Sequence, residues 1–540
     1  MPLTKIVCTL GPATASPDVL RAMIRAGMTV ARLNFSHSDA ADTRQTAALV
    51  RRIAAEEGRH IALMGDLQGP KIRVGHLPAE GIRLEDNALV TLTTEPIQNP
   101  QTEIPFPHAE IIPDVRVGDH ILLDDGALEL IVTAATPTCL HCRVVVGGLL
   151  SSNKGVNLPG APLKIPALTE KDRADALVAL ELALDYLALS FVRRAADIVE
   201  LEDYLYAHSE ESPQRQTGNN PPCIPGIVAK IEKPEALADL EAIARAADAV
   251  MVARGDLGVE ISPEQVPLVQ KQIIHLCNRL GKPVITATQM LQSMMENPRP
   301  TRAEASDVAN AILDGSDAVM LSGETSVGKY PVESVQMMAK IAQSVEDSPH
   351  FPYNQLLELG KKVTDAPDAV IISGAISQAT VVLAEAAWAT AILTSTESGR
   401  TARLVARHRP RIPLLGMTPF AATARRLQLI WGVIPTVVAP FNDTDQMIQT
   451  MVQAAVAQNY VTVGNNVILT AGIPFAFHGV TNMVKVHTVR AEDVKAEDVD
   501  GLTVEALPPQ AVPPHDPAPV PRHASPAKHR SMDTSSSPTV

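Results

Sequence analysis

Eight short apolar runs constrain the fold of this chain more than any other feature. They are TKIVCTL (4–10), TVARLNF (29–35), HIALMGDL (60–67), YLALSF (186–191), GIVAKIE (226–232), AVMVARGDL (249–257), PVITAT (283–288) and AVMLSGE (318–324). Helix-like segments such as ASDVANAILDG lie between most of them. Continuous apolar runs are typical of parallel strands that are buried on both faces. Eight strand–helix units predict an α/β protein built on a (β/α)8 TIM barrel.

Two further segments lie outside this pattern. Residues 70–150 alternate in hydrophobicity and carry turn signals, which predicts a small β-barrel domain inserted as a lid on the barrel. Residues 355–490 predict a C-terminal α/β domain with the strands AVIIS, AILTS, IPLLGM and NVILTAG. The catalytic barrel then comprises residues 1–69 and 151–345. Residues 491–540 are rich in Pro and Ser and predict a disordered tail.

Composition excludes several classes of function. A net charge of −14 argues against a nucleic-acid-binding surface, and no apolar run is long enough to span a membrane. The N-terminal MPLTKIVCTLGPA lacks the features of a signal peptide. Five cysteines in a chain of this length do not form a disulfide framework, and the CLHC pair, Cys139 and Cys142, has no second pair to complete a zinc site. A cytoplasmic protein is expected.

Polar residues gather at the ends of the predicted strands, where barrel enzymes form their active sites. In chain order they are Arg32, Asn34, Ser36, His37, Asp66, Lys230, Glu232, Arg254, Asp256, Thr288, Ser322 and Glu324. Glu232 and Asp256 end neighbouring strands, and two carboxylates without nearby His or Cys favour Mg2+. The alternative is that either acid simply pairs with a cation such as Arg254.

Lys230 lies two residues before Glu232, so both side chains point to the same side of a strand. A lysine beside a metal-binding carboxylate suits the stabilisation of a transferring phosphoryl group. RGDLG then enters a helix-like turn whose backbone amides suit a carboxylate or a phosphate. The chain has neither a Walker loop nor a protein-kinase glycine loop, so phosphoryl transfer would use the barrel site.

Several of these stretches together resemble the pyruvate kinase family. They are TKIVCTLGPA, ARLNFSH, GDLQGPKIR, AKIE, MVARGDLGVE, ITATQMLQSM, PRPTRAEASDVANAILDGSDAVMLSGET and SGRTA, in the family's order across about residues 4–490. The resemblance implies transfer of the phosphoryl group of phosphoenolpyruvate to ADP, giving pyruvate and ATP. It also implies a Mg2+ (or Mn2+) cofactor and a homotetramer, and it makes the C-terminal domain regulatory.

The resemblance also implies roles for individual residues. Glu232 and Asp256 would hold Mg2+, and Lys230 would neutralise the phosphoryl oxygens. The backbone of Gly255 and Asp256, with Thr288, would bind the substrate carboxylate. Thr288, or a water chain near Ser322, would protonate the enolate. The residues expected to contact phosphates of the nucleotide or the substrate are Arg32, His37, Arg73 and Lys171.

The monovalent-cation site departs from the family's pattern. Asn34, Ser36 and Asp66 match residues that coordinate K+ in potassium-dependent members, which carry a glutamate at the position of Lys71. A lysine ammonium is a compact +1 charge. The hypothesis is that Lys71 takes the place of the ion and that K+ is not required. The alternative is that the other three residues still bind K+ while Lys71 points elsewhere.

A phosphate pocket is predicted in TSTESGRTARL (394–404). Its candidate residues are Thr396, Ser398, Gly399, Arg400 and Thr401. Hydroxyls, a glycine and an arginine before a helix suit a phosphorylated effector, although a helix cap beside a surface arginine is the simpler reading. The resemblance places the family's effector site here. The loop AGIPFAFHGVTN lacks the Trp and Arg that help hold fructose 1,6-bisphosphate in some members, so the effector stays open.

The residues alone leave two other functions open. One is a Mg2+-dependent lyase or aldolase of pyruvate-like acids, which would use the same paired carboxylates. The other is a non-catalytic sensor of sugar phosphates, which would have a decayed site. The presence of Lys230, Glu232, Asp256 and Thr288 favours the kinase over both.

Overall fold

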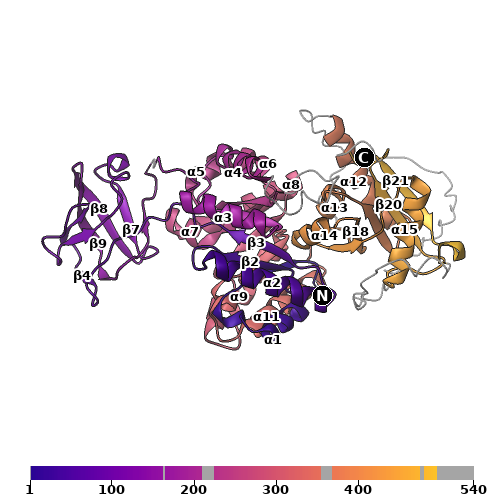
Figure 1. Ribbon diagram of the computed structural model, residues 1–540, viewed down its shortest axis with the longest axis horizontal. Coiled ribbons are helices and arrows are strands. Elements are labelled where there is room, and N and C mark those ends of the chain that lie inside the picture. The colour runs from indigo at the N-terminus through magenta and orange to yellow at the C-terminus, as the bar shows by residue number, and fades with distance from the viewer. Residues whose placement is uncertain (1, 162–163, 210–223, 354–367, 475–479, 495–540) are drawn as a thin grey trace, which may run out of the picture.

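The computed structural model describes residues 2–161, 164–209, 224–353, 368–474 and 480–494. Three parts follow one another along the long axis of the molecule (Figure 1): a lid of β-strands, the barrel, and a C-terminal α/β domain. Among the described residues, no helix combines the length and the apolarity that crossing a bilayer requires. The predicted tail lies outside the described residues, except that Ala491–Val494 forms a short 3-10 helix.

The barrel is closed by eight parallel strands in the order β1-β16-β15-β14-β13-β12-β3-β2. Their bounds are β1 (Lys5–Thr9), β2 (Val30–Asn34), β3 (Ala62–Asp66), β12 (Tyr186–Leu189), β13 (Gly226–Ile231), β14 (Ala249–Ala253), β15 (Val284–Ala287) and β16 (Ala318–Leu321). All eight predicted strands are present, so the TIM barrel is confirmed. The prediction that residues 249–257 form a single strand was wrong, because their second half, RGDL, begins the helix that follows the strand.

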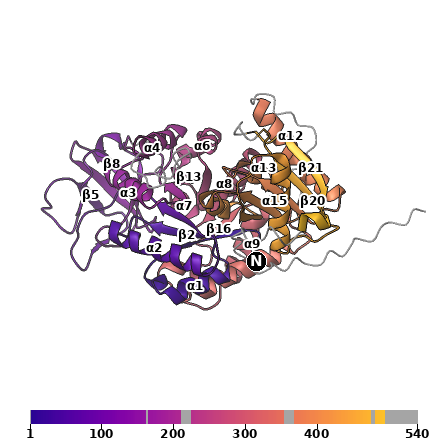
Figure 2. The same cartoon turned by 45° about the vertical axis from the view of Figure 1, so that its right-hand side comes forward.

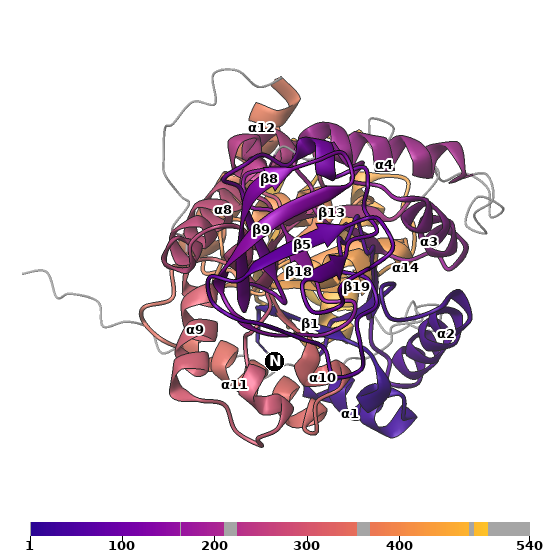
Figure 3. The ribbon, with the colours of Figure 1, turned by 90° about the vertical axis from the view of Figure 1, so that its left-hand side faces the viewer.

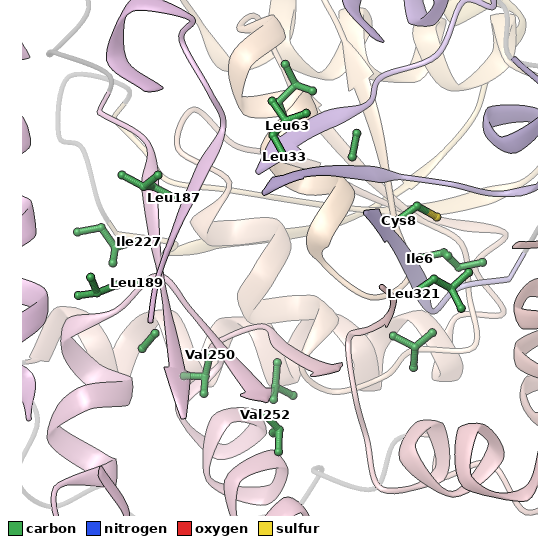
Figure 4. Packing of buried hydrophobic residues seen from close by; sticks show 14 of the residues in the cluster. Ile6, Cys8, Leu33, Leu63, Leu187, Leu189, Ile227, Val250, Val252 and Leu321 are labelled. Carbon is green, nitrogen blue, oxygen red and sulfur yellow. The ribbon is translucent and has the colours of Figure 1, made fainter. Parts of the chain in front are cut away.

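Successive side chains of these strands point to opposite sides of the barrel wall. Ile6, Leu33 and Leu63 belong to the larger cluster that packs the strands against the surrounding helices (Figure 4). Val7 and Met64 belong to a second cluster, made almost entirely of strand residues, that fills the barrel interior. The residue two positions after each of these interior residues points to the same side of the wall. Such residues therefore project into the barrel interior at the C-terminal ends of the strands, where the site forms.

Helices surround the barrel, as the end-on view shows (Figure 3). They are α1 (Pro17–Ala26), α2 (Ala40–Glu56), α3 (Glu170–Glu181), α4 (Ala195–Ala207), α5 (Pro234–Ala238), α6 (Leu240–Ala246), α7 (Arg254–Glu260), α8 (Val266–Leu280), α9 (Arg302–Leu313), α10 (Gly323–Ser326) and α11 (Pro331–Glu346). Local sequence sets their ends. Thr301 caps α9 and shares a reciprocal capping box with Glu304, whereas Gly281 ends α8 in the left-handed conformation at φ 66°.

The inserted lid has its own hydrophobic core. Its strands are β4 (Ile82–Leu84), β5 (Leu89–Thr93), β6 (Glu103–Pro105), β7 (His120–Leu123), β8 (Leu128–Ala135), β9 (Cys139–Val146), β10 (Gly148–Leu150) and β11 (Val156–Asn157). They form a six-stranded sheet, β11-β7-β8-β9-β5-β6, and a two-stranded sheet, β10-β4. The predicted small barrel is thus built as two sheets around one core, because β4 and β10 pair with each other. Cys139 and Cys142 are free thiols on β9.

The C-terminal domain is a five-stranded sheet with helices (Figure 2). Its elements are α12 (Asp368–Ala386), β17 (Ala391–Ser395), α13 (Arg400–Ala406), β18 (Leu414–Thr418), α14 (Ala421–Arg426), β19 (Val433–Val437), α15 (Thr444–Ala457), β20 (Asn466–Ala471) and β21 (Met483–Thr488). The predicted strand AVIIS was wrong, because it lies within α12. A short apolar run cannot be told from a helix by periodicity alone, and this one continues without a turn for 19 residues.

The C-terminal domain closes the floor of the barrel. Leu429 belongs to the cluster that fills the barrel interior. Lys5, on β1, donates from Nζ to the backbone oxygen of Val433 at 2.7 Å. Glu346 of α11 accepts from the backbone and the hydroxyl of Thr4. The start of the barrel is therefore held by the last barrel helix and by the C-terminal domain.

We expect Lys5 to make stability depend on alkaline pH. Burial lowers the pKa of Lys5 to about 8, against the opposing charge of Glu346. Below that pH the fold must keep a buried amine protonated, and this cost disappears as pH rises toward the ordinary lysine value. The unfolding free energy of the parent should therefore rise by up to roughly 3 kcal/mol relative to Lys5→Met between about pH 8 and 10.5. Chemical denaturation across this window measures the difference, with the exposed Lys340→Met as control. A constant gap between parent and Lys5→Met would contradict the expectation.

Candidate active site

The site is centred on Lys230, the last interior-facing residue of β13. Its Nζ lies 2.9 Å from Oε1 of Glu232, 3.2 Å from Oδ1 of Asp66, and 2.7 Å from the hydroxyl oxygen of Ser190. Arg32, from β2, places Nε 2.6 Å from the other oxygen of Asp66. Three strands thus bring two cations and two carboxylates together at the mouth of the barrel, and a fourth strand adds the hydroxyl of Ser190.

The charges of this cluster depend on one another. Burial alone would lower the pKa of Lys230, but Asp66 and Glu232 outweigh burial and hold the pKa above its ordinary value. Burial would raise the pKa of Asp66, but Arg32 and Lys230 hold it below its ordinary range. The two carboxylates therefore favour the charged form of Lys230.

Glu232 and Asp256 are the two carboxylates predicted to hold a divalent cation. Burial is the largest influence on Glu232 and raises its pKa to about 7, and the charge of Asp256 acts in the same direction. A carboxyl group so poorly neutralised suits a cation between the two acids. Among the described residues, no group of three or more His, Cys, Asp or Glu is close enough to bind a metal. Mg2+ at this pair would therefore take its remaining ligands from substrate or water, as it usually does.

Thr288 follows β15 and is held in an uncommon conformation, at φ 69°. Its hydroxyl donates to the backbone oxygen of Ala287 at 2.6 Å and accepts from the backbone amide of Gly255 at 2.7 Å. Thr288 is thus tied to the first turn of α7, where Asp256 lies. The predicted carboxylate-binding elements are brought side by side.

Lys71 does not lie against Asp66. Asp66 is neutralised by Arg32 and Lys230, while Lys71 is exposed and makes no ion pair among those found in the described chain. It lines a cavity between lid and barrel together with Asp125 and Asp256. The structure thus shows Asp66 paired with Arg32 and Lys230, and the placement of Lys71 in the Asn34–Ser36–Asp66 site stays a prediction. Gly69, at φ 66°, and Pro70 turn the chain toward the lid before Lys71 is reached.

The other predicted phosphate-binding residues occupy the surroundings of this cluster. Arg73 bonds the backbone oxygen of Asn153 at 2.7 Å, at the base of the lid. Lys171, in the first turn of α3, donates to the backbone oxygen of Phe35 at 2.8 Å, and Phe35 lies two residues before His37. The backbone of Ser322 is held at 2.7 Å by the buried Glu324.

The loop 396–401 lies before α13. Thr396 and Thr401 are buried, and the hydroxyls of Thr401 and Thr481 are 2.9 Å apart. Gly399 begins α13 at φ 86°. The five predicted effector residues thus lie within residues 396–401 at the start of one helix, and the hydroxyl of Thr401 is already engaged with Thr481.

Sequence reasoning missed Ser190, which follows β12. Its hydroxyl accepts from Lys230 and donates to the backbone oxygen of Leu67 at 2.7 Å. The signal was present, because Ser190 is a hydroxyl residue at the end of a predicted strand. It was overlooked inside the apolar run YLALSF.

The position of this cluster defines a class of protein: a TIM-barrel enzyme that handles an anionic substrate beneath a β lid. A family model described as "Pyruvate kinase, barrel domain" matches residues 1–335, and one described as "Pyruvate kinase, alpha/beta domain" matches residues 374–487. The chain belongs to the pyruvate kinase family and is a phosphotransferase.

Similar proteins support this assignment. Pyruvate kinase 2 of Synechocystis sp. is 46% identical over 492 residues, which cover 90% of this chain and 79% of that protein. The pyruvate kinase of Geobacillus stearothermophilus is 44% identical over 488 residues, covering 90% and 80%. The crystal structure of a pyruvate kinase from Cryptosporidium parvum matches with a TM-score of 0.81 and 34% identity, covering 90% of this chain and 96% of that one.

Proposed function

We propose that the chain transfers the phosphoryl group of phosphoenolpyruvate to ADP with the help of Mg2+ at Glu232 and Asp256. The observation that carries this is the permanently charged Lys230 beside Glu232 at the mouth of the barrel. Mg2+, when bound, would supply positive charge to the phosphoryl and carboxylate oxygens of the substrate.

In this mechanism the chain positions the groups that react. The amides of Gly255 and Asp256 and the hydroxyl of Thr288 hold the substrate carboxylate, while Arg32 and Lys230 face the phosphoryl oxygens. The phosphorus–oxygen bond to enolpyruvate breaks as a bond forms to a β-phosphate oxygen of ADP. Carbon 3 of the released enolate then takes a proton from the Thr288 hydroxyl or from water near Ser322. His37, Arg73 and Lys171 contact nucleotide or substrate phosphates.

Pyruvate formation from phosphoenolpyruvate with and without ADP tests the reaction. We expect turnover only when ADP and a divalent cation are both present. Pyruvate released without ADP would mean that water takes the phosphoryl group, and would count against transfer to the nucleotide. Binding of phosphoenolpyruvate without any turnover would favour a sensor.

We further propose that the enzyme works without K+, with Lys71 supplying the monovalent charge when the lid closes. Two observations support this proposal. Lys71 stands at the junction of lid and barrel, lining the cavity that contains Asp256. It forms no ion pair among the described residues that would hold it in its present place.

Replacement of Lys71 by glutamate tests this role. The parent should show full activity in buffer freed of K+ and NH4+. The rate of Lys71→Glu should rise at least tenfold when KCl is added, because the new carboxylate attracts a cation. Lys154→Glu, at a half-buried residue of the lid that pairs with Asp124, serves as the control. Parental activity that appears only with KCl would exclude the proposal.

We also propose a phosphorylated effector at Thr396, Ser398, Gly399, Arg400 and Thr401, and a homotetrameric assembly. These five residues lie together at the start of α13, which supports the effector site. The exposed Val370, Ile371 and Ile372 on α12 give an apolar face suited to contact between subunits.

The cytoplasm is the proposed compartment, which agrees with the free thiols of Cys8, Cys139, Cys142 and Cys277.

A further inference from the structure

Two adjacent residues after β15 have a backbone conformation that is rare for their side chains. Thr288 has φ 69° and Gln289 has φ 54°. The left-handed region is costly for residues other than glycine, and most of all for a β-branched residue such as Thr. Such a conformation persists only where surrounding contacts fix it. The loop that carries Thr288 must therefore be held by groups outside the loop.

Arg254 holds one side of this loop. Its guanidinium group donates to the backbone oxygens of Ala287 and Thr288 at 3.2 and 2.8 Å. The hydroxyl of Thr288 accepts from the backbone amide of Gly255, in the same turn as Arg254. These contacts fix the first part of the loop. The later part, at Leu291, depends on another partner.

Glu324 is that partner. Its side chain is fully buried, and Oε1 accepts from the backbone amide of Leu291 at 3.0 Å. Oε2 accepts at 2.7 Å from the backbone amide of Ser322, the residue after β16. The bond to Ser322 alone could be explained by the start of α10, but a helix start does not account for a bond to Leu291, 33 residues away. One carboxylate thus joins the ends of two neighbouring strands.

The end of β16 is itself fixed to β1, its other neighbour in the barrel. The hydroxyl of Thr9 donates to the backbone oxygen of Leu321 at 3.0 Å, and the hydroxyl of Thr325 donates to the backbone oxygen of Thr9 at 2.8 Å. Arg32 donates to the Thr9 hydroxyl at 2.8 Å. Glu324 therefore stands on a part of the barrel mouth that does not depend on the loop after β15.

We propose that Glu324 is a positioning residue for protonation of the enolate. It holds Thr288 and Ser322, the two places from which the proton would come, in a fixed relation to each other. This inference rests on the proposed function, which assigns protonation to those two places. Lys230, which acts on the phosphoryl group, is held by Asp66 instead. Loss of Glu324 should therefore slow proton transfer far more than phosphoryl transfer.

Glu324→Gln breaks the joint between the two strand ends with little change of shape. The amide keeps one acceptor oxygen and replaces the other by an NH2 group, which cannot accept from a backbone amide. Glu346→Gln is the matched control, because Glu346 is also buried and its two oxygens accept from the backbone amides of Leu3 and Thr4 at the floor of the barrel. Glu324→Asp keeps both oxygens on a shorter side chain and should lose less than Glu324→Gln.

Two measurements separate the two steps of the reaction. Exchange of the carbon-3 hydrogens of pyruvate with D2O, followed by NMR with Mg2+ and ATP present, reports proton transfer. Chemical quench of the ATP formed in the first turnover of phosphoenolpyruvate and ADP reports phosphoryl transfer. We expect Glu324→Gln to slow the exchange at least about tenfold and first-turnover ATP formation less than about threefold, since a misplaced proton donor loses part of a contribution of that scale or larger. Glu346→Gln should change neither rate by more than about threefold.

Circular dichroism verifies that each variant is folded, and Glu324→Asp takes the place of Glu324→Gln if the latter is not. Equal losses in the two measurements would mean that Glu324 acts on the structure as a whole, and would overturn the proposal. Unchanged exchange in a folded Glu324 variant would overturn it as well. A parent that forms no ATP would overturn the proposed function, and the role of Glu324 with it.

Discussion

Lys230→Met should lower the rate of phosphoryl transfer on the order of 1,000-fold, the scale on which removal of one preorganised electrostatic donor acts. The ammonium is held between Asp66 and Glu232 before substrate arrives, so no reorganisation is needed when charge develops on the phosphoryl group. Since its main contribution is to the transition state, kcat should fall far more than KM for phosphoenolpyruvate rises. Steady-state kinetics separate the two constants.

The neighbouring Lys233 offers a matched control. It lies three residues later and pairs with Glu260 at 2.6 Å, away from Asp66. Lys233→Met should change kcat less than tenfold. Removal of Lys230 also leaves the buried Glu232 without its cation and Asp66 with Arg32 alone, so the variant is expected to be less stable. Its kinetics are therefore measured at a temperature where circular dichroism shows it folded. Equal losses in the two variants would mean that the effect is structural.

Glu232→Gln should weaken binding of a divalent cation at least about 100-fold, since even the loss of a partner to a metal ligand costs 10–100-fold. The amide keeps the shape of the side chain, and its single oxygen can still accept from the backbone amide of Phe191, as Glu232 does at 2.8 Å. What is lost is the negative charge beside Asp256. Electron paramagnetic resonance of free Mn2+ measures the affinity without any need for turnover.

Glu260 provides the control for this measurement. It is also buried near the cleft, but Lys233 and Asn157 bond its Oε1 at 2.6 and 2.8 Å. Glu260→Gln should therefore leave Mn2+ binding within about threefold of the parent. Unchanged Mn2+ binding in Glu232→Gln would place the cation elsewhere and remove Glu232 from the proposed site.

The barrel and the gathering of polar side chains at its mouth could be predicted because both follow from local patterns. Strands buried on both faces leave continuous apolar runs, and a period of two places Lys230 and Glu232 on the same side of β13. Other features could not be predicted, because they depend on three-dimensional geometry that a sequence pattern does not contain. The direction of Lys71 depends on the turn at Gly69, and AVIIS carries no signal that separates strand from helix. The contact of Glu324 with the loop after β15 arises only when β15 and β16 lie side by side.

The docking of the C-terminal domain also bears on the order in which the chain can fold as it is synthesised. The first strand, β1, pairs with β16, more than 300 residues later, and Lys5 finds its acceptor at Val433. The barrel floor also receives Leu429 from the same region. A nascent chain therefore carries an incomplete first domain until most of the protein has left the ribosome. A chain cut between the two domains would leave that floor facing water.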